Sequence, residues 1–368
     1  RYIFSILLLL ISITVNATKY YIDTTGVDDA GRNGGIGQEW KTLAYACTRV
    51  TTPGDTIHVN AGTYYETTTA LLAVGVNIIG EGNSSILTSS STSSSYRIIT
   101  AESVNQNTSG NNTISYLKLD GNSDTVYVAI RIRNRGNFVI HHCTIIDFYS
   151  IGIDQYNGSG SGEPSNYATG FKIHDCTIDN SSLYSSASNG NVQISGLEGA
   201  EIYNNSITCI TPGINKGILI KGTNKYFKGL KIYNNKLLKI HTGSNLPFSI
   251  ELWDSKGGIE IYNNIIWGEI DLVRCVRGSY SFGAKIHNNI IGENISATKY
   301  HPALGLEWSS EYIYFYHNYV QNMVNAVSFS GGGGSTVMDN IWIYYNIFKN
   351  IGSLNDDIQY QRAMYAIT

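Results

Sequence analysis

Charged side chains are scarce in this sequence: Asp, Glu, Lys and Arg make up 14% of its 368 residues, and the net charge is −3. A nucleic-acid-binding domain needs a strongly basic surface, so this composition argues against nucleic acid as a partner. The polar residues are mainly Asn, Ser, Thr and Tyr, and Ile is abundant. This composition favours a β-protein whose outer faces are polar but uncharged.

Cysteine is also rare, and its spacing matches no metal-binding motif. The five cysteines, an odd number, are widely separated and include no CxxC pair: Cys47, Cys143, Cys176, Cys209 and Cys275. This pattern excludes a small disulfide-stabilised scaffold and gives no indication of a zinc motif.

Helical periodicity is almost absent. Only the segment Glu39–Val50 has the apolar spacing of an amphipathic helix. We expect this helix to cover the N-terminal end of a β-structure, where unpaired strand edges would otherwise promote aggregation. Residues 18–65 are therefore predicted to form an N-terminal cap and the first coil.

The one long apolar run lies at the N-terminus, from Ile3 to Val15 after Arg1, and is followed by Ala17 in a small-x-small pattern. It predicts a signal peptide over residues 1–17, and it is too short for an ordinary membrane span; a retained anchor is the alternative. We therefore expect a secreted or cell-surface protein with no membrane association beyond the export signal. Because the chain starts on Arg and stops within a repeat-like stretch, we also expect it to be a fragment, truncated at the C-terminus.

Internal repetition is the strongest signal in the sequence. Eight copies of a short motif follow one another at spacings of 33, 29, 30, 29, 25, 29 and 28 residues. The copies begin at Ile140, Ile173, Ile202, Ile232, Ile261, Ile286, Phe315 and Ile343. Constant motifs at variable spacing indicate a fixed strand frame with loops of adjustable length, and hence one long solenoid over residues 18–368.

Apolar residues alternate within each copy, as expected for a strand with one face in the core. The third residue after the leading position is Asn in six copies, and Cys143 and Cys176 in the other two. We expect these amides to stack from coil to coil as an Asn ladder. A disulfide between the two cysteines is geometrically possible, but free thiols are the favoured prediction.

A second alternating strand precedes each copy, so each coil has at least two strands, and an apolar position after the Asn indicates a third. The second strands are predicted at Ala129–Arg133, Ile151–Gln155, Val192–Gly196, Ile218–Gly222, Ile250–Asp254, Ile270–Arg274, Leu304–Trp308 and Val327–Ser330. We expect the resulting solenoid to be a monomer.

The eight copies resemble the pectate-lyase-like β-helix superfamily. Four early segments are similar to the opening of many secreted β-helix carbohydrate-active proteins: Tyr20–Asp23, Trp40–Leu43, Pro53–Ile57 and Ala61–Tyr64. The resemblance implies an all-β, right-handed parallel β-helix. It does not fix the activity, because the superfamily includes lyases, hydrolases, epimerases, esterases and non-catalytic adhesins.

The second strands place outward side chains in two columns, one residue per coil. One column is predicted to read Arg131, Gly152, Gln193, Leu219, Glu251, Asp271, Gly305, Ser328, and the other Arg133, Asp154, Ser195, Lys221, Trp253, Val273, Glu307, Ser330. Ionisable residues are concentrated in the middle coils. Lys221, Glu307, Trp253 and Trp308 are the candidate substrate-binding residues, because exposed aromatics stack on sugar rings; an equally weighted alternative is that the Trp rings cover neighbouring side chains.

Glu251 and Asp271 are predicted to lie one coil apart, at about the 5 Å spacing of paired strands. With Asp254 they are candidate ligands for Ca²⁺, which prefers oxygen donors. The same spacing suits the carboxylate pair of a retaining glycosidase. The alternative is that they are exposed carboxylates neutralised by Lys256 and Arg274.

The segment Glu251–Lys256, followed one coil later by Asp271–Arg274, resembles the alginate lyase and chondroitinase B family. That resemblance implies that Glu251 binds Ca²⁺, that Lys256 abstracts a proton and that Arg274 donates one. The match is imperfect, because Ser249 stands where a second acidic residue is usual and the interval from Lys256 to Arg274 is short.

Two further patterns have structural explanations that we favour. The outward aromatic column His141, His174, Tyr203, Tyr233, Tyr262, His287, Tyr316, Tyr344 could bind glycans, but self-stacking is the favoured interpretation. His141, His142, His174 and Asp175 contain metal-ligand residue types, yet their places in the repeat explain them better.

Together these features predict a secreted protein that acts on an acidic polysaccharide, with β-elimination ahead of hydrolysis. The rival hypothesis from another class is a non-catalytic binding module or adhesin.

Overall fold

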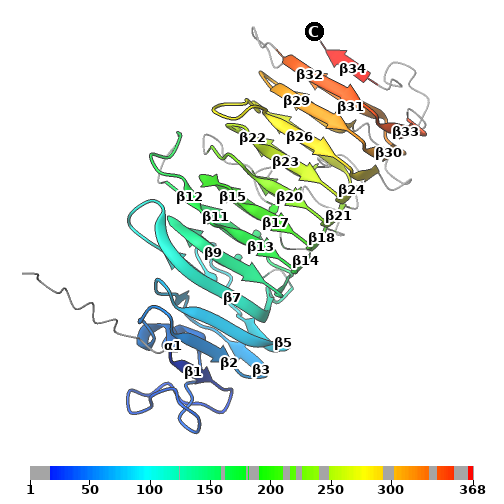
Figure 1. The fold of residues 1–368 in the computed structure, drawn as a ribbon. Helices are drawn as coiled ribbons and strands as arrows, with labels where there is room; N and C mark the ends of the chain where they lie inside the picture. The colour runs from blue at the N-terminus through cyan, green and yellow to red at the C-terminus, as the bar shows by residue number, and fades with distance from the viewer. Residues whose placement is uncertain are drawn as a thin grey trace, which may run out of the picture.

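The computed structural model describes residues 17–123, 125–158, 162–179, 181, 190–209, 216–220, 226–239, 248–292, 302–330, 338–351 and 364–367. These residues form the predicted right-handed parallel β-helix, whose strands stack along one axis (Figure 1). Every described pairing between named strands is parallel, and most coils contribute three strands, as the sequence indicated.

The first strand of each coil belongs to an 11-stranded sheet, which contains the predicted second strands. Its members, in spatial order, are β4 (Ala70–Leu71), β6 (Arg97–Glu102), β8 (Val128–Arg133), β11 (Ile151–Tyr156), β15 (Gly190–Ser195), β19 (Lys216–Ile220), β22 (Phe248–Trp253), β25 (Glu269–Val273), β28 (Pro302–Glu307), β31 (Asn325–Ser330) and β34 (Met364–Ile367).

The other two strands of each coil belong to a 21-stranded sheet with two arms. The first arm carries the repeat motif: β1 (Lys19–Ile22), β2 (Thr56–Val59), β5 (Asn77–Thr88), β7 (Thr108–Asp120), β9 (Arg135–His141), β13 (Lys172–His174), β17 (Glu201–Tyr203), β20 (Lys231–Tyr233), β23 (Ile259–Tyr262), β26 (Ala284–His287), β29 (Glu311–Tyr316) and β32 (Asp339–Tyr344).

The second arm follows the Asn position: β3 (Gly62–Tyr65), β10 (Thr144–Ile146), β14 (Thr177–Asp179), β18 (Ser206–Cys209), β21 (Lys236–Lys239), β24 (Ile265–Trp267), β27 (Ile290–Gly292), β30 (Tyr319–Gln321) and β33 (Ile347–Lys349). The long strands β5 and β7 run through both arms and join them. A two-stranded sheet of β12 (Ala168–Thr169) and β16 (Leu197–Glu198) completes the described strands.

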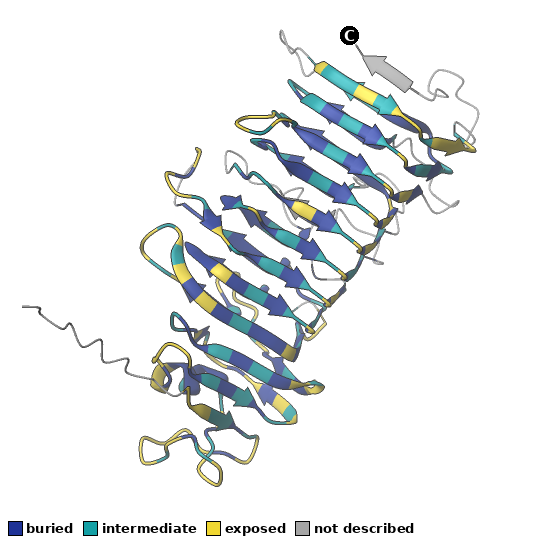
Figure 2. Ribbon diagram, in the orientation of Figure 1, coloured by how far each residue is buried: buried dark blue, intermediate teal, exposed yellow. Residues whose placement is uncertain are grey.

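The core runs along the axis of the helix, and Figure 2 shows the buried positions alternating along the strands. The leading residues of the first seven copies are fully buried, and they stack in register as predicted, for example Ile202 on Ile173 and Ile232 on Ile202. In the eighth copy Ile343 is only half-buried and Phe348 is exposed. Each fully buried Ile contributes about 1.5–3 kcal/mol, so the repeated column is the main source of stability.

The predicted Asn ladder is present. Its rungs are Asn205, Asn235, Asn264, Asn289, Asn318 and Asn346, and each amide is bonded to the next within 3.1 Å. Each rung also donates to the backbone carbonyl of the leading residue of the preceding coil, from Asn205 to Ile173 through to Asn346 to Phe315.

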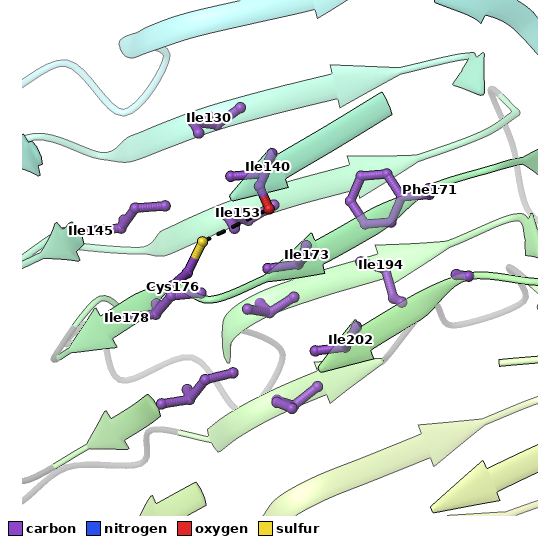
Figure 3. Close-up of a cluster of buried hydrophobic side chains, with 14 of the residues drawn as sticks. Ile130, Ile140, Ile145, Ile153, Phe171, Ile173, Cys176, Ile178, Ile194 and Ile202 are labelled. Atoms are coloured by element: carbon purple, nitrogen blue, oxygen red, sulfur yellow. Dashed lines mark hydrogen bonds between the residues drawn. The ribbon is translucent and has the colours of Figure 1, made fainter. Parts of the chain in front are cut away.

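Cys143 and Cys176 replace two rungs of this ladder as free thiols, as favoured, and the other three cysteines are also free. Their Sγ atoms point to the carbonyls of Ile114 and Ile140, which are the leading-position carbonyls of the coils before them. Figure 3 shows Cys176 among the buried Ile side chains with its bond to Ile140. The thiol therefore retains the donor role of the amide.

The residue before each rung turns the chain between the two arms. It has a positive φ in all eight copies, between 53° and 57°, and is Asn in four of them. Asn tolerates this left-handed conformation better than most residues, which explains the recurring Asn-Asn pair.

The predicted helix is present but shorter than expected: α1 spans Leu43–Arg49. Its start is delayed because Trp40 pairs with Ile22 in a β-bridge, and Thr42 then caps the helix by accepting a hydrogen bond from the Tyr45 amide. It lies beside β1 and β2 at the N-terminal end (Figure 1) and buries Leu43, Ala46 and Cys47. The predicted signal peptide falls outside the described residues except for Ala17.

Candidate functional site

The 11-stranded sheet places Glu251 directly beside Asp271 on the neighbouring strand, as predicted. Gly305 follows Asp271 one coil later. The predicted columns are wrong at β11, however, where Asp154 rather than Gly152 lies beside Arg131 and Gln193. A shift of two residues keeps the same side chains facing the core, so alternation alone could not detect it. The second column is displaced by the same shift, and Tyr156 takes the place predicted for Asp154.

The candidate carboxylates are buried, with only 2% of Glu251 and of Asp271 exposed. Glu251 accepts a hydrogen bond of 2.8 Å from the indole of Trp253. The alternative that they are exposed groups neutralised by Lys256 and Arg274 is therefore wrong, because those two cations pair with Glu163 and Asp254 instead.

A third acidic residue, Glu269, lies beside Asp271 and was not predicted. A Cβ atom on Gly305 would lie 2.5 Å from Glu269 Oε1 and 2.8 Å from Asp271 Oδ1. Both carboxylates thus occupy space that only glycine leaves open. No sequence pattern indicated Glu269, because it begins β25 one residue before the predicted strand.

Arg274 is held by Asp254 from the preceding coil. Its Nε lies 2.5 Å from Asp254 Oδ1, and its Nη2 lies 3.0 Å from Asp254 Oδ2. This bidentate pair raises the pKa of Arg274 above its ordinary value, mainly through the hydrogen bonds. The guanidinium therefore remains cationic at any physiological pH.

Both residues of this pair follow the strands of the 11-stranded sheet and have positive φ, 59° at Asp254 and 53° at Arg274. The left-handed conformation turns each side chain out of the pattern set by its strand. Arg is a poor residue for that conformation, and such unfavourable backbone positions are concentrated at functional sites.

Trp253 and Trp308 flank the Arg274 guanidinium. Its carbon lies 5.2 Å from the Trp253 ring centroid and 4.7 Å from that of Trp308, within the range of cation–π attraction. The two rings are 5.7 Å apart at an angle of 66°. Both side chains are half-buried, so each ring keeps part of its surface open to solvent.

Lys256 and Arg274 line the same pocket, which has a volume of about 250 Å³. The Lys256 ammonium lies 4.5 Å from the Tyr226 ring centroid and 3.6 Å from Glu163 Oε2. The complete lining is Tyr226, Asp254, Ser255, Lys256, Arg274, Val276 and Ser309. Sequence reasoning missed Tyr226 and Ser309 because they lie outside the alternating strands.

The remaining candidates are less central. Lys221 lies outside the described residues. Glu307 is half-buried beside Val273, and its backbone carbonyl accepts a hydrogen bond from the Arg274 amide at 3.2 Å.

Among the described residues, no helix is long and apolar enough to cross a membrane.

The outward aromatic column stacks on itself, as favoured. Neighbouring rings from His141 to Tyr344 lie 4.8–5.2 Å apart, and their planes deviate by no more than 14°. The ring faces are therefore largely used against one another and are not open for stacking on a sugar.

Solved structures share this fold at low sequence identity. The native GH136 lacto-N-biosidase from Eubacterium ramulus matches with a TM-score of 0.57 and 11% identity over 90% of this chain and 68% of that chain. The A-module of the mannuronan C-5 epimerase AlgE4 from Azotobacter vinelandii matches with a TM-score of 0.52 and 14% identity, over 88% and 92%. No protein-family model matches the sequence, and no curated protein matches it. At these identities the likeness shows the fold alone.

Proposed function

We propose that this protein is a secreted carbohydrate-active β-helix protein that binds an acidic polysaccharide at the Arg274 pocket and cleaves it by β-elimination. The observation that carries the proposal is the placement of Arg274 between two indole rings beside Lys256. Aromatic faces suit the apolar faces of sugar rings, and the Arg274 cation suits a uronate carboxylate. The names of the two similar structures, a lacto-N-biosidase and a mannuronan C-5 epimerase, support a carbohydrate ligand.

β-Elimination requires a base for the C5 proton of the uronate and a cation for its carboxylate. As the base removes the proton, its electron pair forms the C4–C5 double bond, the C4–O bond breaks, and the leaving oxygen takes up a proton. Positive charge at the carboxylate stabilises the negative charge that develops there. Arg274 provides such a charge permanently, because its pKa is raised.

Lys256 is the proposed base, since it lines the pocket that contains Arg274, and its amine can accept the proton after the ammonium has given up its own. The raised pKa argues against the expected role of Arg274 as proton donor. Tyr226 lines the same pocket, and its hydroxyl can supply the proton to the leaving oxygen.

Calcium would be held by the buried carboxylates rather than by Asp254. Glu251, Glu269 and Asp271 provide the oxygen donors that Ca²⁺ prefers, and two of them converge beside Gly305. Both Asp254 oxygens are bonded to Arg274. A bound Ca²⁺ would supply positive charge close to an acidic substrate.

The test is the ultraviolet absorbance of unsaturated uronate products, measured with Ca²⁺ on alginate, chondroitin and pectate. We expect absorbance to rise on at least one polymer and the rise to be lost in Lys256→Ala and Arg274→Ala. Lys228→Ala and Arg277→Ala are matched controls, because both side chains also lie over aromatic rings but do not line the pocket. Absence of the product on every uronate tested would overturn the elimination step.

Hydrolysis is the second candidate, favoured by the convergence of Glu269 and Asp271 on Gly305. A hydrolase would release new reducing ends without ultraviolet absorbance, and Asp271→Asn would abolish them. If neither product forms while binding persists, the protein is a non-catalytic binding module.

A further inference from the structure

Four side chains with metal-ligand chemistry gather at one turn of two neighbouring coils. His141 and His142 lie at the end of β9, and His174 and Asp175 lie at the end of β13. The strands pair in register, with His174 directly beside His141. This turn joins the two arms of the 21-stranded sheet, whereas the Arg274 pocket follows strands of the 11-stranded sheet, so the two places are separate.

Two of these residues occupy the left-handed position of the repeat. His142 and Asp175 have φ of 53° and 54° and are exposed. Four other copies have Asn at this position: Asn204, Asn234, Asn263 and Asn288. The turn makes the same backbone hydrogen bond in the His, Asp and Asn copies. The amides of His142, Asp175 and Asn204 each donate to a backbone carbonyl of the next coil. The turn therefore does not require His or Asp here, and it holds both side chains on the surface.

The donor atoms are close enough to share one ion. One ligand atom each from His142, His174 and Asp175 lies within 4.8 Å of the others. The Nδ1 of His174 is 2.7 Å from Asp175 Oδ2, and the Nδ1 of His142 is 2.9 Å from His141 Nδ1. Ligands of a tetrahedral Zn²⁺ site with bonds of 2.0–2.1 Å lie about 3.4 Å apart, so small rotations of these surface side chains complete the site.

We propose that His142, His174 and Asp175 bind a divalent transition metal of the Zn²⁺ class. Two imidazoles and one carboxylate are ligands that Zn²⁺ accepts, with water completing the coordination, whereas Ca²⁺ prefers a shell of oxygens. His141 is the supporting partner, because a metal-bound imidazole commonly donates its other N–H to a neighbouring acceptor. The thiols of Cys143 and Cys176 face the core carbonyls and are not ligands.

A metal here would join two coils at an exposed turn. Its ligands come from both coils, and an ion that binds only the folded chain stabilises that state by mass action. The exposed positions of His142 and Asp175 give the ion direct access from solvent.

The test is titration of the untagged, metal-stripped protein with Zn²⁺ by calorimetry, and with Co²⁺ by visible absorption. Variants take the residue that other copies have at the same position: His142→Asn, His174→Tyr and Asp175→Asn. We expect binding of one ion, weakened more than roughly ten-fold by each change, the smallest loss typical of supporting residues. Thermal unfolding should shift upward with Zn²⁺ only in proteins that bind it.

The matched controls make the same substitutions at histidines that stand at equivalent positions of the repeat but outside this cluster. His317→Asn and His287→Tyr correspond to His142→Asn and His174→Tyr at equivalent positions. They should leave the Zn²⁺ affinity within about two-fold of that of the wild-type protein. The proposal is overturned if the wild-type protein binds no Zn²⁺, or if binding survives in the triple variant. This test does not measure elimination activity. A failure to bind Zn²⁺ would therefore leave the proposed function unaffected.

Discussion

Replacing one rung of the Asn ladder tests how the coils are held together. Asn264 is 1% exposed and bonds in both directions along the stack. Its Nδ2 donates to the Ile232 carbonyl at 2.9 Å, and its Oδ1 accepts from the Asn235 amide at 2.9 Å. The substitution Asn264→Ala removes these two bonds together with those to Asn235 Nδ2, Tyr262 and Asn289. It leaves the Ile232 carbonyl and the Asn235 amide without these partners.

The magnitude follows from these two groups. A buried polar group left unsatisfied costs about 1–3 kcal/mol, so Asn264→Ala should lower the free energy of unfolding by about 2–6 kcal/mol. Asn264→Cys should lower the free energy of unfolding by less, because the thiols of Cys143 and Cys176 reach the equivalent carbonyls of the coils before them.

Urea denaturation followed by circular dichroism measures this difference. The control is Asn263→Gly at the neighbouring residue, where φ is 56° and glycine is unstrained. We expect the control to remain within about 1 kcal/mol of the wild-type protein. A loss in Asn264→Ala below about 1 kcal/mol, or one no larger than in Asn263→Gly, would refute the ladder's energetic role.

Two further predictions follow from other positions. Gly305→Ala should lower the thermal midpoint, at a cost of about 1–3 kcal/mol, because its Cβ would collide with the carboxylates of Glu269 and Asp271; an unchanged midpoint in calorimetry would contradict this packing. Burial lowers the pKa of His287 below its ordinary 6.5. As the pH falls below 6.5, the unfolded chain therefore binds a proton before the folded chain does, and stability decreases until the lowered pKa is passed. Between about pH 7 and about pH 5, the thermal midpoint of His287→Gln should fall less than that of the wild-type protein. An equal fall would contradict the lowered pKa of His287.

The sequence was sufficient for the parts of the fold that repeat. The leading apolar residues, the Asn positions with their two Cys replacements and the stacked aromatic column recur through the eight copies, so one alignment predicts them. It failed at β11, where a two-residue shift preserves the inward and outward pattern and so leaves no trace in the sequence.

The candidate site was less predictable because it does not repeat. Sequence reasoning identified Trp253, Lys256, Arg274 and Trp308 as a group, and the structure brings them to one place. It did not predict the bond between Arg274 and Asp254, which depends on left-handed turns that redirect both side chains. Burial of the carboxylates also depends on the folded surroundings, which strand alternation does not describe.

The most direct test of the central claim is tryptophan fluorescence during titration with an acidic oligosaccharide, because Trp253 and Trp308 lie against the proposed binding residue. We expect a saturable change with an oligouronate that is absent with a neutral glucan, is abolished by Arg274→Ala and is retained in Arg277→Ala. An equal response to neutral and acidic sugars, or an unchanged response in Arg274→Ala, would contradict the claim that this pocket recognises an acidic polysaccharide.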